Sequence, residues 1–187
     1  VVWLFSIVHL DMNLGKSLNK PKLGLILAKS RAVNTLSAAR LFLFGARDVW
    51  FVVALPVYLL SEMDWSEWAV GAFLASWVIG YGVVQSIAPR ITGYAEGQVP
   101  DGRTALMWAL ALSCIPALIA ITLADDLNIE LSLTLGLLVF GGVFAVNSAV
   151  HSYLIVSYAE SDGASLDVGF YYMANAIGRL LGTVLSG

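Results

Sequence analysis

The stretch from Ala32 to Leu60 is apolar enough to cross a lipid bilayer, yet it contains Arg40, Arg47 and Asp48. About 20 apolar residues suffice for a helix to cross the hydrocarbon core. A charged side chain at the bilayer centre costs at least ~2.5–3.5 kcal/mol on insertion scales. Three charges in one span therefore need a reason: either they pair inside a helix bundle, or they line a wet cavity.

The rest of the chain is equally apolar. Of its 187 residues, 59% are hydrophobic and 12% are charged, whereas soluble domains have roughly 25% charged and 45–50% apolar residues. The apolar residues gather in blocks of bilayer-spanning length. We therefore expect an all-α polytopic membrane helix bundle with spans at about 33–60, 67–89, 104–124, 131–157 and 167–187.

The distribution of positive charge predicts the orientation of these spans. Residues 11–32 contain five Lys and Arg residues, so the positive-inside rule places this loop in the cytoplasm. We expect residues 1–10, which are apolar, to be the end of a preceding transmembrane helix. The chain would then be an internal piece of a larger protein whose N-terminal half is missing. Because the loops are short, we expect neighbouring spans to pack antiparallel.

The first span places its charges in one stripe. Residues at i, i+3, i+4 and i+7 share a helix face, so Arg40, Phe44, Arg47 and Phe51 align, with Asp48 beside Arg47. Arg40 lies near the cytoplasmic end and could extend its guanidinium group to the interface. Arg47 and Asp48 lie near the middle of the span, where such an escape is difficult.

Two later spans also have polar faces, whereas the third does not. Asn147 and His151 share a face of the fourth span, and a fifth-span stripe contains Asn175 and Arg179. Beside that stripe, small residues recur every four positions, which lets two helices approach closely; they are Ala174, Gly178, Gly182 and Ser186. The third span has no ionisable side chain except Cys114, and predicts a lipid-facing support helix with a kink at Pro116.

The charges of these faces favour an anionic ligand. The bundle interior would be net positive, and a positive cavity attracts anions. Arginine suits phosphate-like and carboxylate groups because it donates two hydrogen bonds in one plane. The candidate substrate-binding residues are Arg40, Arg47, Asn147, His151, Asn175 and Arg179.

Other readings stay open for the same residues. Asp48 could carry a coupling proton or could simply form an ion pair with Arg47. Asn147 could form an interhelical hydrogen bond rather than contact a ligand, and His151 could have a satisfied structural role. A non-transporting membrane protein whose intramembrane charges are structural ion pairs is therefore an alternative.

Other function classes are disfavoured. The chain has no Gly-x-Ser-x-Gly, His-Glu-x-x-His or P-loop motif, and we do not expect an enzyme or a cofactor. Its single cysteine, Cys114, excludes an internal disulfide and a multi-thiolate metal site. No basic run indicates nucleic-acid binding.

The order of the segments resembles the second half of a major facilitator superfamily transporter. A basic central loop follows a hydrophobic end, and alternating spans follow with an apolar third one. In this superfamily two six-span halves enclose a cavity at mid-membrane. The resemblance implies that residues 1–10 end the sixth span and that 33–187 contain the seventh to eleventh, the ninth facing lipid.

Five local strings are similar to a narrower family, the organoarsenical efflux permeases of the ArsJ type. They include the charged intramembrane residues, although loop 90–103 departs from the basic loop signature of the superfamily. The strings are LSAARLFLFGARDVWFVVALPVYL (36–59), WVIGYGVVQSIAP (77–89), PDGRTALMWAL (100–110), NSAVHSYLIVSYA (147–159) and SLDVGFYYMANAIGRLLGTVLSG (165–187).

This resemblance implies a function. Such permeases of the bacterial inner membrane are thought to export 1-arseno-3-phosphoglycerate, which a glyceraldehyde-3-phosphate dehydrogenase forms when it uses arsenate. The exported ester then breaks down outside, so arsenate in the cytosol falls. The resemblance implies a multi-pass efflux transporter that confers arsenate resistance, with an anionic small molecule as substrate. A major facilitator transporter of another anionic metabolite or drug is the alternative in the same superfamily.

Overall fold

The computed structural model describes residues 30–94, 97, 100–125, 128–159 and 164–187. The regular elements of this part are all helices: α3 (Arg31–Phe51), α4 (Ala54–Ser61), α5 (Glu67–Ile91), α6 (Gly102–Ala124), α7 (Ile129–Tyr158) and α8 (Ala164–Ser186). The expected end of a preceding span at 1–10, and all but the last residues of the loop 11–32, lie outside the described residues.

Four segments are long and apolar enough to cross a membrane: Arg31–Ser61, Glu67–Ile91, Gly102–Ala124 and Ile129–Tyr158. The prediction of an all-helical membrane bundle is confirmed at this level. The expected fifth span forms α8, which has 23 residues. It is not among the four because the polar residues of its stripe lower its hydropathy.

Side-chain caps explain where three of the helices begin. Ser30 Oγ accepts a hydrogen bond from the backbone N–H of Val33 at 3.2 Å, so α3 starts two residues before the expected span. Ser66 caps α5 in the same way. Asp101 and Thr104 form a reciprocal capping box at α6. These side chains satisfy backbone donors that a helix start leaves without partners.

The first span is broken between α3 and α4, at Val52 and Val53. Pro56 explains the position of the break: proline lacks the N–H that would bond to the carbonyl of Val52, and its ring clashes with that carbonyl. Ser186 Oγ accepts from the backbone N–H of Ala54 at 3.2 Å, so α8 caps the second segment. The expected continuous span is therefore two helices.

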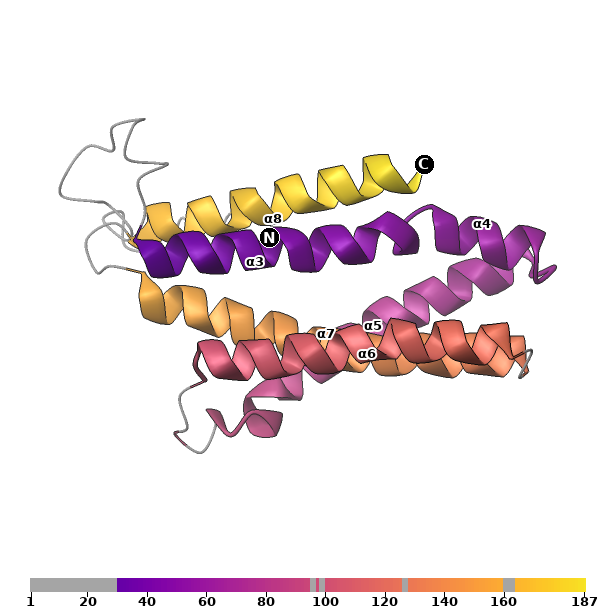
Figure 1. Cartoon of the computed structure of the whole chain (residues 1–187), viewed down its shortest axis with the longest axis horizontal. Coiled ribbons are helices and arrows are strands. Elements are labelled where there is room, and N and C mark those ends of the chain that lie inside the picture. Colours follow the sequence, from indigo (N-terminus) through magenta and orange to yellow (C-terminus); the bar gives the residue numbers. More distant parts are fainter. Residues whose placement is uncertain (1–29, 95–96, 98–99, 126–127, 160–163) are drawn as a thin grey trace, which may run out of the picture.

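The helices form two groups that lie side by side (Figure 1). α3 packs along α8, and this is the most extensive helix contact in the described part; α5 and α6 both pack on α7. α3 and α8 run parallel, because Leu41 faces Gly178 and Gly45 faces Gly182. α3 and α8 are far apart along the chain, so their parallel packing does not bear on the antiparallel packing expected of spans joined by short loops.

Three clusters of buried apolar residues hold the groups together. At the end where α3 begins, Val33, Leu36 and Tyr171 pack with residues of α6 and α7. In the middle, α3, α5, α6 and α7 contribute an aromatic cluster, and at the far end α4 packs with α5 and α7. The aromatic cluster consists of Phe44, Trp77, Leu112, Phe140 and Phe144.

One glycine allows the middle cluster to form. A Cβ at Gly141 of α7 would lie 2.8 Å from Nε1 of Trp77, so only glycine leaves room for the indole ring. Trp77 Nε1 donates to the carbonyl of Leu137 at 2.8 Å, which satisfies the polar end of a buried ring. This contact fixes α5 on α7.

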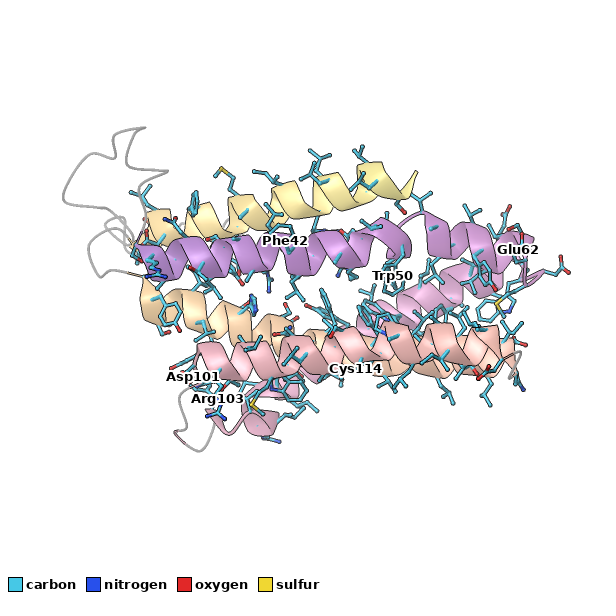
Figure 2. The ribbon with its side chains drawn as sticks, viewed as in Figure 1. Phe42, Trp50, Glu62, Asp101, Arg103 and Cys114 are labelled. Carbon is cyan, nitrogen blue, oxygen red and sulfur yellow. The ribbon has the colours of Figure 1, made fainter. Side chains whose placement is uncertain are left out.

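Exposed charged residues lie toward both ends of the bundle (Figure 2). Glu62 lies at one end, and Asp101 and Arg103 lie toward the other. Cys114 lies between the ends and is exposed on α6. Only Ala105 and Leu112 of α6 are buried, as the prediction of a support helix requires.

Candidate functional site

A single buried carboxylate joins two arginines from different helices. The Asp48 side chain is 1% exposed and lies next to the midpoint of the segment Arg31–Ser61. Its Oδ1 accepts from Arg47 Nε at 2.6 Å, and its Oδ2 accepts from Arg179 Nε at 3.1 Å. Asp48 therefore links α3 to α8 through charge-assisted hydrogen bonds.

The two arginines differ in exposure. The Arg47 side chain is 11% exposed, whereas that of Arg179 is 55% exposed. Aromatic rings surround Arg47: its guanidinium carbon lies 4.9 Å from the ring centres of both Phe44 and Phe144. Such cation–π contacts compensate for part of the lost hydration. Arg47 is thus held firmly, while Arg179 has an open side.

A close contact of small residues positions this cluster. A Cβ at Gly178 would lie 2.2 Å from the carbonyl oxygen of Leu41, and a Cβ at Gly182 would lie 2.5 Å from that of Gly45. The same Cβ at Gly182 would lie 2.9 Å from Cβ of Asp48. The predicted small-residue seam is confirmed, and it brings the two backbones close enough for Arg179 to reach Asp48.

Arg40 has neutral hydrogen-bonding partners. Its Nε donates to Asn175 Oδ1 at 3.2 Å, and its Nη1 donates to Oγ of Ser148 at 2.9 Å and to the carbonyl of Ser148 at 3.2 Å. Arg40 is 5% exposed and lies over the rings of Phe44 and Tyr171. The expectation that Arg40 could extend to the interface is wrong, because these contacts turn it into the bundle.

The hydroxyl group of Ser148 extends this network to α5. Tyr81 donates from its hydroxyl to Ser148 Oγ at 3.1 Å, so side chains of α3, α5, α7 and α8 meet around one serine. The sequence analysis did not assign Ser148 or Tyr81 to the site. The spacing of Ser148 from Ser152 and His151, on one side of α7, is the signal that could have indicated it.

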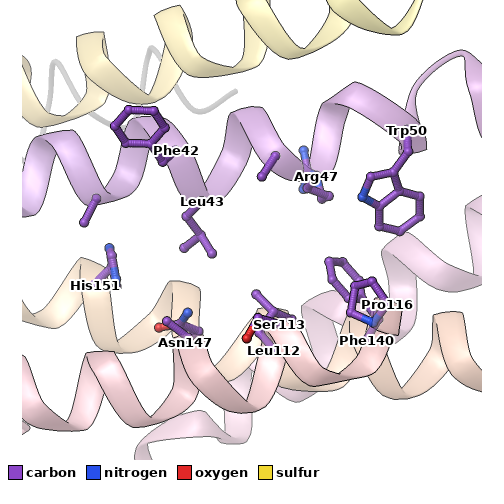
Figure 3. Close-up of a pocket in the computed structure, with 13 residues that line it drawn as sticks. Phe42, Leu43, Arg47, Trp50, Leu112, Ser113, Pro116, Phe140, Asn147 and His151 are labelled. Carbon is purple, nitrogen blue, oxygen red and sulfur yellow. The ribbon is translucent and has the colours of Figure 1, made fainter. Parts of the chain in front are cut away.

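Two candidate residues line a cavity on the other side of α3. Asn147 and His151, together with Arg47, line a space of about 340 Å³ between α3, α6 and α7 (Figure 3). Its other walls are mostly apolar and include Phe42, Trp50, Leu112 and Phe140. The helix α6, which was expected only to be a lipid-facing support, therefore also forms a wall of the cavity. Its lack of ionisable side chains gave no sign of this role.

A second cavity adjoins the first along the same helices. It has a volume of about 690 Å³ and shares Ala39, Ala109 and His151 with its neighbour. It extends toward the start of α3, where Arg31 and Tyr158 contribute to its lining. The two cavities thus follow α3 from its N-terminal end to the middle of the span.

The six candidate substrate-binding residues fall into three places. Arg47 and Arg179 share Asp48, Arg40 and Asn175 bond to each other, and Asn147 and His151 line the cavity. Arg47 belongs to two of these places, because it also lines the cavity. No group of three His, Cys, Asp or Glu side chains that could hold a metal ion occurs among the described residues.

Comparison with protein-family models, with curated proteins and with solved structures found no match to this chain.

Proposed function

We propose that this protein is a membrane transporter of an anionic substrate that works by alternating access. The observation that carries the proposal is the shared position of Asp48 between Arg47 and Arg179, deep in an apolar span. Intramembrane ionisable residues are expensive and mark substrate pathways as a rule. A cluster with spare positive charge is suited to bind an anion.

The charge balance favours an anion over a cation. Arg40, Arg47 and Arg179 are three cations, and Asp48 supplies one anion among the groups to which they bond. Within the described part of the chain the partners of Arg40 are neutral, so no carboxylate of this part compensates its charge. The resulting positive potential raises the local concentration of anions.

The exposure of each group indicates its role. Arg179 is open on one side and would make the first contact with an oxyanion, whereas Arg47 would hold it from within the bundle. In the empty transporter, Asp48 bonds to both arginines and compensates one of their two positive charges. Arg40 bonds to residues of α7 and α8 and would act by its charge rather than by contact.

The finer proposal is an exporter of an organoarsenical anion in the bacterial inner membrane, with the architecture of the major facilitator superfamily. Its support is the resemblance of the five strings named above, which contain Arg40, Arg47, Asp48 and Arg179. A substrate with a phosphate and an arsenate end fits a site that offers two guanidinium groups. It would act together with a glyceraldehyde-3-phosphate dehydrogenase that forms the ester.

The apolar walls of the cavity favour a second candidate of the same class. Phe42, Trp50 and Phe140 would suit the carbon body of a larger organic anion, such as an anionic drug. Arsenate-independent transport by the reconstituted full-length protein would favour this candidate over the organoarsenical.

Arsenate resistance tests the proposal. The full-length protein is expressed in an arsenate-sensitive bacterium, with and without the dehydrogenase, as wild type and as Arg47→Ala and Arg179→Ala variants. Arg103→Ala is the matched control, because Arg103 is exposed at the start of α6. We expect resistance that needs both proteins, is lost in the two variants and is kept in the control.

Three other outcomes would contradict this proposal in part or as a whole. No resistance, with the wild type present in the membrane, rejects the organoarsenical and leaves another anion. Full resistance in both arginine variants at equal membrane levels rejects the site. If the arginine variants fail to fold and the wild type transports no anion, the result would instead support a membrane protein with structural ion pairs.

A further inference from the structure

Three buried polar atoms of side chains that line the same cavity as Arg47 have no hydrogen-bond partner among the residues that the structure describes. They are Nδ2 and Oδ1 of Asn147 and Nδ1 of His151. Asn147 is 0% exposed and His151 is 4% exposed. A buried polar group without a partner costs about 1–3 kcal/mol, so such groups persist where something completes their bonds.

These atoms belong to side chains that face one cavity. Asn147 and His151 are one helical turn apart on α7, and both point into the space between α3, α6 and α7 (Figure 3). Its volume of about 340 Å³ lies at the lower end of the range of about 300–1,000 Å³ for small-molecule pockets. The cavity therefore has room for a small ligand.

The chemistry of the side chains restricts that ligand. A free amide offers a donor and an acceptor together, and a neutral imidazole adds one further donor or acceptor. A bare oxyanion accepts hydrogen bonds but donates none, so it would leave Oδ1 of Asn147 without a partner. A hydroxyl group beside the oxyanion would supply the missing donor.

The charge near the cavity supports an oxyanion at the same place. Arg47 contributes to the cavity wall, and Arg40 bonds to Ser148, the residue next to Asn147. Ser113 also lines the cavity, and its hydroxyl group donates to the carbonyl of Leu110 at 2.8 Å. Asn147 and His151 thus supply the buried polar atoms of the wall that have no partner among the described residues.

We propose that this cavity binds a small oxyanion that carries a hydroxyl group beside its charged end. Asn147 and His151 form hydrogen bonds with that hydroxyl group. This inference rests on the proposed function, because Arg47 is the shared wall between the cavity and the Asp48 cluster. It narrows the substrate from anions in general to hydroxylated phosphates, arsenates or carboxylates.

A matched pair of ligands tests the proposal. Binding of 2-hydroxyethyl phosphate and of ethyl phosphate is measured by calorimetry with the purified full-length protein in lipid nanodiscs. The two compounds differ by one hydroxyl group. We expect the wild type to bind the hydroxylated compound about tenfold more tightly, which corresponds to about 1.4 kcal/mol.

Substitutions test whether Asn147 is responsible for the preference for the hydroxylated phosphate. Asn147→Leu, which has nearly the same shape, should reduce the ratio of the two affinities to about one while ethyl phosphate still binds. Ser157→Ala should keep the tenfold ratio, because Ser157 lies outside the cavity wall and its hydroxyl donates to the carbonyl of Leu154 on its own helix. If the leucine variant has lost its thermal unfolding transition, Asn147→Ala is measured instead.

The outcomes separate this inference from the proposed function. Equal wild-type affinities for the two phosphates would overturn the inference and leave the anion transporter standing, with water completing the bonds of Asn147. A tenfold ratio that survives in the Asn147 variants would overturn the role of Asn147. Binding of neither phosphate would count against an oxyanion site as a whole.

Discussion

The backbone of Gly178 touches that of Leu41, and this contact decides how closely α8 approaches α3. A Cβ at position 178 would lie 2.2 Å from the Leu41 carbonyl oxygen, a distance at which the two backbones must separate. The arginine beside this glycine, Arg179, bonds to Asp48 on α3. The geometry of the charged cluster therefore depends on a residue that has no side chain.

Gly178→Ala should destabilise the protein and weaken transport together. Overpacking of a close contact costs typically about 1–3 kcal/mol, and here the obstacle is backbone rather than a flexible side chain. Thermal unfolding in detergent measures the effect. Gly142→Ala is the control, since nothing lies within 4 Å of a Cβ there; an equal loss of stability in both variants would contradict this account.

Arg47→Gln and Arg179→Gln should differ in stability although both reduce transport. Removing one partner of a buried ion pair costs about 3–5 kcal/mol, and the Arg47 side chain is 11% exposed. The Arg179 side chain is 55% exposed, so its pair contributes only about 0–1 kcal/mol. Unfolding midpoints of the two variants, measured beside anion uptake, test the distinction. A large loss of stability for Arg179→Gln would show that it is mainly structural.

Arg40→Lys should not preserve the network around Ser148. Lysine cannot donate from two directions in one plane, whereas Arg40 bonds to Asn175 and Ser148 at the same time. We expect Arg40→Lys to lower the free energy of unfolding by about 1.5–3 kcal/mol, the contribution of a hydrogen bond to a charged group. Tyr81→Phe, which removes one hydroxyl from the same network, should cost about 0.5–1.5 kcal/mol. Similar unfolding midpoints for Arg40→Lys and the wild type would contradict the assignment.

Asp101 should make stability depend on acid pH. Hydrogen bonds from Thr104 lower the pKa of the Asp101 carboxyl from its ordinary value of 3.8. A lowered pKa in the folded state means that the stabilisation is present above pH 3.8 and disappears as the pH falls through the folded value. Asp101→Asn keeps a capping side chain and should remove this part of the pH dependence. Parallel acid titrations of the unfolding midpoint for wild type and variant would settle the point.

Periodicity along single helices was enough to predict part of this site. The stripe of Arg40, Phe44 and Arg47 follows from the helical repeat, and the contacts between each guanidinium and the Phe44 ring agree with it. The small-residue spacing around Gly178 likewise predicted a close helix contact. Both features depend on one helix at a time, which is why the sequence pattern reveals them.

Contacts between distant helices could not be predicted in the same way. The pairing of Asp48 with Arg179 joins positions 131 residues apart, and the spacing within either helix does not specify the partner. The inward turn of Arg40 depends on Ser148 and Asn175, which come from two other helices. The break before Pro56 was not predicted, and the helices against which α4 packs are known only from the assembled bundle.

The break at Val52 and Val53 has a mechanical consequence. An unbroken helix of this span would be a stiff rod roughly 46 Å long. Any tilt of its C-terminal end would then turn Arg47 and Asp48 as well. With a joint between them, α4 follows the packing core that it shares with α5 and α7, while α3 stays with α8. The direction of α4 is therefore set separately from that of α3, so a change of packing around α4 need not displace Arg47 and Asp48.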